Sequence, residues 1–302
     1  MYSRREIATI GLAGLAAPLA GLFAGGAADV HLGVNTSSFG NLTRALGTDP
    51  IDALIQALVA CDVHECELSA GQVEPRFGGG HVAHHTMSSM SPQMMRRELR
   101  KWRLRTPAAY FAAIGARFRK AGIAIHAYNY SPNRSFTDEE INQGFISARA
   151  LGADLITAST TADVARRVAP FADRHRMIVA IGEDSKVSDA NPTGATVKSA
   201  INLSPYFKVN LDIGHCIAAN LDTVDYLRAH HATIRTLRLK DRRRNGESVQ
   251  WGTGDAPIRE VLQLLKREAW PIRAYVEYDY AGHASPVDEV KRCLAYASRS
   301  LV

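Results

Sequence analysis

The chain has 302 residues, of which 46% are hydrophobic and 22% are charged, a balance typical of globular proteins. One large α/β domain accommodates this length without a second core. The formal net charge is +6, and much of the excess lies in two clusters, Arg96–Arg105 and Arg242–Arg244. A nucleic-acid-binding protein needs a broad basic face with interleaved aromatic residues, so these clusters are interpreted as solvated loop charge. Nucleic acid is excluded as a partner.

Residues 1–28 have the composition of an export signal. Arg4 and Arg5 precede an apolar run from Ile7 to Ala24, and small residues follow. A charged start, an apolar middle and a small-residue end are typical of a twin-arginine signal. A membrane anchor is the alternative for a run of this length, but its small side chains favour a cleaved signal. We therefore expect a single domain over residues 29–302, a periplasmic or secreted protein, and no membrane contact in the mature form.

Short apolar runs alternate with helix-like segments along the remaining chain. Strands are predicted at His31–Asn35, Glu65–Leu68, Ile123–Tyr128, Leu155–Ala158, Met177–Ile181, Phe207–Asp212, Thr236–Lys240 and Ala274–Tyr278. Helices are predicted at Asp52–Ala60, Thr106–Ala121, Ile141–Leu151, Asp222–His230, Pro257–Glu268 and Pro286–Ser298. Thr106 is expected to cap one helix start, and Thr137 another with an acidic first turn. This alternation favours a (β/α)8 TIM barrel, an α/β fold, over an open sheet.

The segment Gly71–Arg100 differs in composition from the rest of the chain, with a run of three glycines at Gly78–Gly80, several methionines and the cluster His81, His84 and His85. A histidine cluster can bind metal. Without an acidic or cysteine partner nearby, a mobile flap over the barrel mouth is the preferred interpretation.

The four cysteines are Cys61, Cys66, Cys216 and Cys293, and no CxxC pair or zinc-ligand spacing occurs among them. Disulfides are an alternative in an exported protein, but buried free thiols are the expectation.

Charged side chains follow three of the predicted strands. Asp212 and His215 follow one strand, Arg238 and Lys240 lie at the end of the next, and Glu277 lies at the end of the last. In a parallel barrel these strand ends meet at the C-terminal mouth, where TIM-barrel active sites lie. No glycine-rich nucleotide-binding motif opens a helix.

Seven motifs carry a family resemblance: ELSAGQVEP, AYNYS, LGADLITAS, LDIGH, LKDR, GTGDAPI and VEYDY. Together they resemble the xylose isomerase-like TIM barrels, the sugar phosphate isomerase/epimerase group. The resemblance covers essentially the whole chain after the signal segment. It implies proton abstraction next to a sugar carbonyl and a small-molecule sugar as substrate.

The resemblance also implies one divalent metal ion at the mouth, held by side chains of strands five to eight. Asp212 and Glu277 match two ligand positions, whereas the other two positions carry Gly182 and Arg238, which cannot ligate. We expect no metal, or only a weakly bound Mn, Mg or Zn ion. A rebuilt site using Glu183 is one alternative.

The preferred alternative is that Arg238 replaces the metal by lying between Asp212 and Glu277 and stabilising an oxyanion. A site that has lost its function is the third possibility.

Further residues are candidates for the same mouth. His215 is expected to act on the substrate or to orient Asp212. Lys240 is expected to point to the same face as Arg238, with its pKa lowered by that neighbour, or to form an ion pair with Asp241 or Glu277. Four further residues are predicted to contact the sugar: Glu67, His126, Asn129 and Glu183. A buried salt bridge is the alternative for Glu67, and core packing is the alternative for His126.

The predicted function is a sugar isomerase or epimerase, or a lyase or hydratase acting on an oxidised sugar such as a 3-oxo-glycoside. A non-catalytic sugar-binding barrel is the first rival, because two ligands are missing. An abasic-site endonuclease shares the barrel, but it requires more histidine and acidic ligands for several zinc ions than this chain offers.

Overall fold

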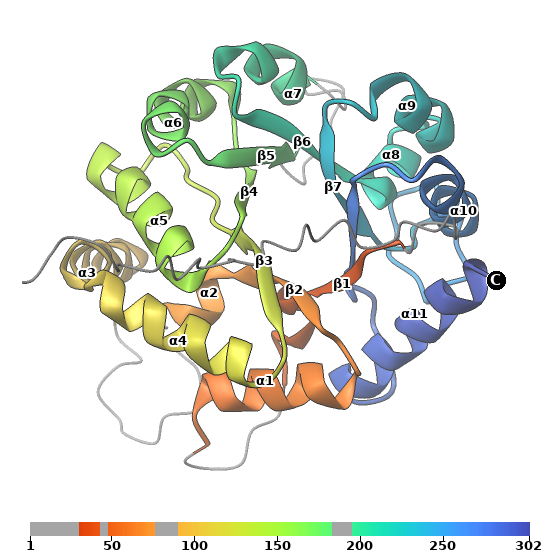
Figure 1. Cartoon of the computed structure of the whole chain (residues 1–302), viewed down its shortest axis with the longest axis horizontal. Coiled ribbons are helices and arrows are strands. Elements are labelled where there is room, and N and C mark those ends of the chain that lie inside the picture. Colours follow the sequence, from red (N-terminus) through yellow and green to blue (C-terminus); the bar gives the residue numbers. More distant parts are fainter. Residues whose placement is uncertain (1–29, 43–47, 76–89, 183–194) are drawn as a thin grey trace, which may run out of the picture.

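Eight parallel strands close into a barrel in the computed structural model, which describes residues 30–42, 48–75, 90–182 and 195–302. Each strand pairs with the next one in the sequence, and β8 pairs with β1 (Figure 1). The strands are β1 (Leu32–Asn35), β2 (Glu65–Ser69), β3 (Ala124–Asn129), β4 (Leu155–Ser159), β5 (Ile178–Gly182), β6 (Phe207–Asp212), β7 (Ile234–Leu239) and β8 (Arg273–Val276). The TIM-barrel prediction is confirmed, and each predicted strand overlaps an observed one.

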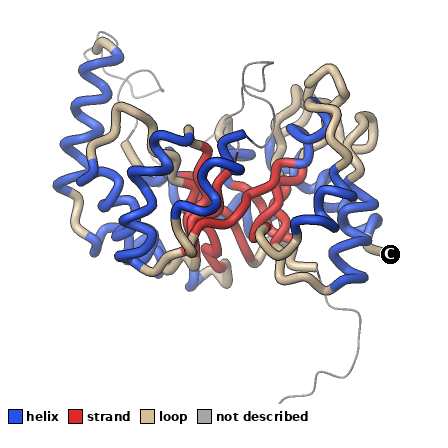
Figure 2. The backbone as a smooth tube through the Cα atoms, turned by 90° about the horizontal axis from the view of Figure 1, so that it is seen from above, coloured by secondary structure: helices blue, strands red, loops and turns tan. Residues whose placement is uncertain are grey.

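Helices surround the barrel, and the strands occupy the middle of the molecule in the perpendicular view (Figure 2). The α-helices are α1 (Pro50–Ala60), α2 (Ala70–Val73), α3 (Pro92–Arg105), α4 (Ala108–Lys120), α5 (Asp138–Leu151), α6 (Ala162–His175), α7 (Ala195–Ala200), α8 (Ile213–Ala218), α9 (Thr223–His230), α10 (Ile258–Glu268) and α11 (Pro286–Ser300). Two short 3-10 helices are η1 (Thr36–Phe39) and η2 (Ile201–Leu203). Within the described ranges, no helix combines the length and apolarity needed to cross a membrane.

An apolar layer fills the barrel interior. Ala127, Leu155, Ala180 and Tyr275 form one buried cluster there. The ring of Tyr275 has room because β1 carries Gly33, where a Cβ atom would lie 3.0 Å from that ring and 2.7 Å from a backbone oxygen. The small residues and the one large aromatic ring therefore complement each other in volume, as close packing requires.

Two strand pairs contain an extra residue that interrupts their register. Cys66 pairs with Ile125 and Glu67 with Ala127, which leaves His126 as the extra residue of β3. In the same way, the pairing of β6 with β7 skips Arg235. A bulge of this kind redirects one side chain without ending the strand.

The structure confirms one of the two predicted helix caps and contradicts the other. The Thr137 hydroxyl accepts from the Glu140 amide at 3.3 Å, and the Glu140 carboxylate accepts from the Thr137 amide at 3.0 Å, so this capping box is confirmed. The predicted cap at Thr106 is wrong. Helix α3 already occupies the preceding residues, so Thr106 ends α3 and donates to the Trp102 carbonyl at 2.7 Å.

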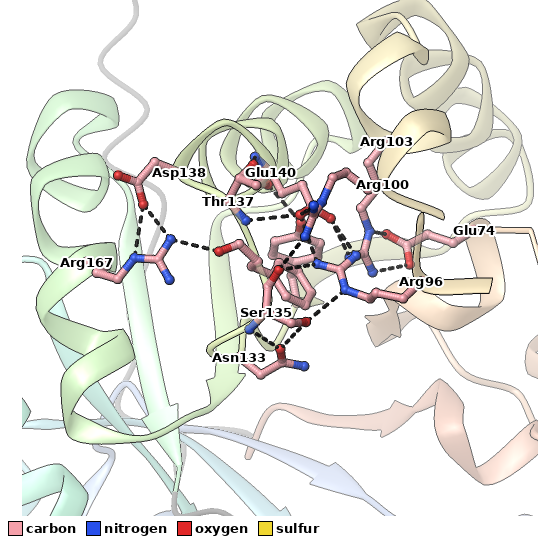
Figure 3. Close-up of polar contacts among 12 residues, drawn as sticks. Glu74, Arg96, Arg100, Arg103, Asn133, Ser135, Thr137, Asp138, Glu140 and Arg167 are labelled. Atoms are coloured by element: carbon pink, nitrogen blue, oxygen red, sulfur yellow. Dashed lines mark hydrogen bonds and ion pairs between the residues drawn. The ribbon is translucent and has the colours of Figure 1, made fainter. Parts of the chain in front are cut away.

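Three arginines of α3 converge on one buried carboxylate at the start of α5 (Figure 3). Arg96, Arg100 and Arg103 lie 2.7, 3.0 and 3.2 Å from the carboxylate of Glu140, which has no exposed side-chain surface. Arg103 also binds Glu74 at 2.7 Å. For these three arginines the interpretation as solvated loop charge is therefore wrong. Burial opposes ionisation, but the arginines and the Thr137 amide dominate and lower the pKa of Glu140 to about 2.

The predicted flap lies only partly within the described residues. Its last residues, Pro92–Arg100, belong to helix α3, which is fixed to α5 by these contacts. The histidine cluster at His81, His84 and His85, the signal segment 1–28 and Glu183 lie outside the described residues.

Candidate functional site

A buried carboxylate, Glu67, organises the polar side chains inside the barrel. It accepts from Asn35 Nδ2 at 2.6 Å, from Asn129 Nδ2 at 3.3 Å and from the hydroxyl of Thr157 in a short hydrogen bond. Arg238 donates to it from Nη2 at 2.7 Å and from Nε at 3.3 Å. Burial would raise the pKa of Glu67, but Arg238 and the hydrogen bonds leave it below its ordinary value. Glu67 is therefore ionised and fully paired.

The position of Arg238 differs from the prediction. Its guanidinium was expected between Asp212 and Glu277, but its closest carboxylate is that of Glu67. Nε lies 3.8 Å from Glu277 Oε2, and no ion pair joins Arg238 to Asp212. The long side chain of Arg238 crosses the barrel interior from β7 to β2, because a shorter cationic side chain already fills the predicted place.

That side chain is Lys240, which follows β7 and is buried. Its Nζ atom lies 2.9 Å from Asp212 Oδ2, 3.2 Å from Glu277 Oε1 and 3.6 Å from Asp279 Oδ2. Burial would lower the pKa of Lys240, but the three carboxylates raise it above its ordinary value. The expected lowering of this pKa by Arg238 is therefore wrong, whereas the expected ion pair with Glu277 is present.

Helix α8, which begins within the motif LDIGH, packs against the side chain of Lys240. Asp212 caps the helix by accepting from the amide of His215 at 3.0 Å. Gly214 lies against the stem of Lys240, so that a Cβ atom there would stand 2.6 Å from Lys240 Cγ. Glycine at this position is thus a steric requirement of the buried lysine.

His215 presents both ring nitrogens to the protein interior without a hydrogen-bond partner among the described residues. Its Nε2 atom lies 3.6 Å from Asp212 Oδ2. Burial lowers the pKa of His215, and the neighbouring cations act in the same direction, while Asp212 opposes them. The imidazole is therefore neutral at pH 7 and has a nitrogen free to accept a proton.

Asp241 has a structural role that the sequence alone did not reveal. Its carboxylate accepts from the backbone amides of Gly252 at 2.8 Å, Gly254 at 3.0 Å and Ala256 at 3.2 Å. Lys240 and Asp241 both follow β7, and Asp241 binds the loop while Lys240 binds the carboxylates at the mouth. The motifs LKDR and GTGDAPI therefore form one unit, in which an acidic side chain shapes the glycine-rich loop.

The prediction for His126 is wrong. His126 lines a pocket of about 270 Å³ with Asp154, Arg235 and Arg273, residues at the N-terminal ends of their strands. It also forms a short hydrogen bond with the Tyr275 hydroxyl. Burial and the two arginines lower the pKa of His126 to about 3. The bulge in β3 thus turns His126 away from the C-terminal mouth, where a sugar was expected.

The cysteine prediction is confirmed. Cys61, Cys66, Cys216 and Cys293 are all free and buried. Cys216 follows His215, but burial raises the pKa of its thiol to about 12, so it is not a ready nucleophile.

The described side chains of the mouth do not fit a divalent metal ion. Among the residues that the structure describes, no three histidine, cysteine or acidic side chains are grouped to hold a metal. Gly182, at a ligand position implied by the resemblance, has no side chain, and a Cβ atom there would lie 3.2 Å from the Asn210 carbonyl oxygen. The gap between Asp212 and Glu277 contains the ammonium of Lys240.

Comparison with known proteins agrees with this architecture. The family model described as xylose isomerase-like TIM barrel matches residues 93–297, which is more than half of the chain. The chain belongs to the xylose isomerase-like TIM barrel family. No curated protein matches it.

Several solved structures are similar in fold to this chain. An L-ribulose 3-epimerase has a TM-score of 0.61 and 12% identity over 90% of this chain and 95% of its own. A 3-keto-D-glucoside 4-epimerase from E. coli has a TM-score of 0.62 and 10% identity over 90% of this chain and 100% of its own. A sugar phosphate isomerase/epimerase from Parabacteroides distasonis has a TM-score of 0.59 and 14% identity over 93% of this chain and 98% of its own. At these identities the likeness concerns the fold.

Proposed function

We propose that this xylose isomerase-like barrel is an enzyme that removes a proton from the carbon next to a sugar carbonyl. The observation that carries the proposal is the unpartnered imidazole of His215 beside the ionised Asp212 and the charged Lys240. A neutral imidazole can accept the proton, and fixed positive charge lowers the energy of the oxyanion that forms.

The step leaves the electron pair of the broken carbon–hydrogen bond in an enediolate, whose negative oxygen faces the cationic side of the mouth. His215 is proposed as the base, with Asp212 stabilising the imidazolium, and Lys240 and Arg238 as the positive charges. Return of a proton to the opposite face of the carbon gives an epimer, whereas loss of a β-oxygen substituent gives elimination. Asn129 donates a hydrogen bond to Glu67, and both residues are proposed to support the sugar-facing groups.

The substrate class is proposed to be an unphosphorylated ketose or a 3-oxo-glycoside. The twin-arginine-like start of the chain supports this choice, because phosphorylated sugars are rare outside the cytoplasm. We also propose that residues 1–28 direct the protein to the periplasm or the medium. The name of the E. coli neighbour, a 3-keto-D-glucoside 4-epimerase, is consistent with an oxidised glycoside.

Deuterium exchange tests the reaction without knowledge of the product. The protein is incubated in D₂O with methyl 3-oxo-β-glucoside or with a ketose, and ¹H NMR follows the signals next to the carbonyl. Exchange above the buffer rate is expected for the wild type, and His215→Gln should reduce it by about 10²–10⁴. Saturable sugar binding with no exchange would instead favour a non-catalytic sugar-binding barrel. That alternative gains support from the extensive pairing of Glu67 and Arg238.

A further inference from the structure

The three oxygen atoms around Lys240 Nζ define a site shaped for an ammonium ion. Their distances of 2.9, 3.2 and 3.6 Å match charge-assisted hydrogen bonds and ion pairs. Oxygen ligands of a divalent ion lie at about 2.0–2.6 Å, so the same carboxylates would have to contract around a metal. The nitrogen therefore lies where a cation is needed, at the spacing that an ammonium prefers.

Lys240 is held in this place by its surroundings and is not a flexible surface lysine. Its side chain is 5% exposed, and its stem fills the space that Gly214 leaves open. Asp212 and Glu277 are 10% and 14% exposed. Without the ammonium, two nearly buried carboxylates would face each other with no cation between them, which is a costly arrangement.

We propose that the ammonium of Lys240 is the resident cation of the C-terminal mouth and takes the place between Asp212 and Glu277 that a divalent metal ion would otherwise fill. The site is thereby independent of metal. Its link to catalysis rests on the proposed function, whereas its effect on cation binding does not.

A manganese titration tests the proposal directly. Wild-type protein, Lys240→Ala and Lys240→Gln are treated with chelator, and the EPR signal of free Mn²⁺ is followed as protein is added. Lys208→Ala is the matched control, because Lys208 lies on the neighbouring strand β6 and has no ion pair to a described residue. Wild type and Lys208→Ala should leave the free Mn²⁺ signal unchanged when metal and protein are equimolar. Lys240→Ala should bind about one Mn²⁺ per chain, at least tenfold more tightly than the wild type.

Lys240→Gln keeps a long side chain but replaces the ammonium by a neutral amide, whose oxygen can ligate a metal ion, so it provides a folded variant if Lys240→Ala is insoluble. It should also gain Mn²⁺ binding, with a rise in melting temperature on metal addition that the wild type lacks. Stoichiometric Mn²⁺ or Zn²⁺ on the wild type would overturn the proposal. Absence of any gain in folded Lys240→Gln would overturn it as well.

Chemical rescue separates this inference from the proposed function. If the wild type exchanges deuterium, Lys240→Ala should lose the activity, and methylammonium should restore part of it because the ion can enter the vacated site. Failure of the wild type to exchange any carbonyl sugar would refute the proposed function. Mn²⁺ gain in the lysine variants would still establish the ammonium site in that case.

Discussion

Arg238 donates from Nη2 to Oε1 of Glu67 over 2.7 Å, and this contact joins β7 to β2 inside the barrel. Removal of one partner of a buried ion pair leaves an uncompensated charge and costs about 3–5 kcal/mol. Arg238→Met should therefore lower the free energy of unfolding by that amount, measured by urea denaturation. The double variant Arg238→Met/Glu67→Gln should recover most of the loss. An unchanged urea midpoint in Arg238→Met would show that the pair does not stabilise the fold.

Asp241 offers a test of the loop at residues 252–256. Asp241→Ala leaves three backbone amides without their acceptor, and we expect a cost of about 3 kcal/mol. For a domain of this size the melting temperature should fall by about 6–12 °C. Asp255→Ala is the control in the same loop, since its exposed carboxylate accepts only from the Arg244 amide. Equal melting temperatures for the two variants would contradict the role given to Asp241.

The lowered pKa of Glu140 predicts that the free energy of unfolding depends on pH. Its pKa falls from the ordinary 4.5 to about 2 in the folded protein, so its contribution is fully present above pH 4.5 and is lost as pH falls towards 2. The difference corresponds to about 3 kcal/mol. Glu140→Gln should flatten the decline in unfolding free energy between pH 5 and 2.5. Glu98→Gln, a change at a half-exposed carboxylate of the facing helix α3, should keep the decline, and an unchanged slope in Glu140→Gln would refute the prediction.

Gly214 and Gly71 form a matched pair of helical glycines. Alanine at Gly214 would place Cβ 2.6 Å from Lys240 Cγ, whereas alanine at Gly71 would meet nothing within 4 Å. Gly214→Ala should lower the free energy of unfolding by about 1–3 kcal/mol through overpacking. Gly71→Ala should leave it unchanged or raise it by up to about 1 kcal/mol through helix propensity. Calorimetry of the two variants measures the difference in stability. A Gly214→Ala variant more stable than the wild type would show that the Lys240 side chain can shift without cost.

The proposed export signal can be tested by exchange of its two arginines. Arg4→Lys together with Arg5→Lys should retain the protein in the cytoplasm, because the twin arginines are the recognised feature. Immunoblots of cytoplasmic and periplasmic fractions provide the measurement. Normal export of the double variant would exclude the twin-arginine route.

The strands were predictable because each buried strand is a short apolar run bounded by polar residues, as in Leu155–Ser159. The gathering of Asp212, Lys240 and Glu277 at one mouth followed from strand order alone. The pairing of each cation with its carboxylate could not be predicted, because it depends on how far each side chain extends across the barrel interior. Arg238 is long enough to reach β2, and Lys240 is short enough to stay beside its own strand.

The errors have equally local causes. His126 was predicted to contact the sugar because it lies on the third predicted strand, but one extra residue in the pairing of β2 with β3 changes the direction of its side chain. Arg96, Arg100 and Arg103 were interpreted as solvated charge because their partner Glu140 lies far away in the sequence. A spacing of three and four between arginines on one helix face was the signal that could have suggested a shared partner.

The apolar layer of Ala127, Leu155, Ala180 and Tyr275 separates two polar groups of residues. Among the described residues, no hydrogen bond links the group at His126 to the group at Glu67. Substitutions at the two mouths should act additively on stability, so that the end carrying His126 and Arg235 can be redesigned while the chemistry at Lys240 stays intact.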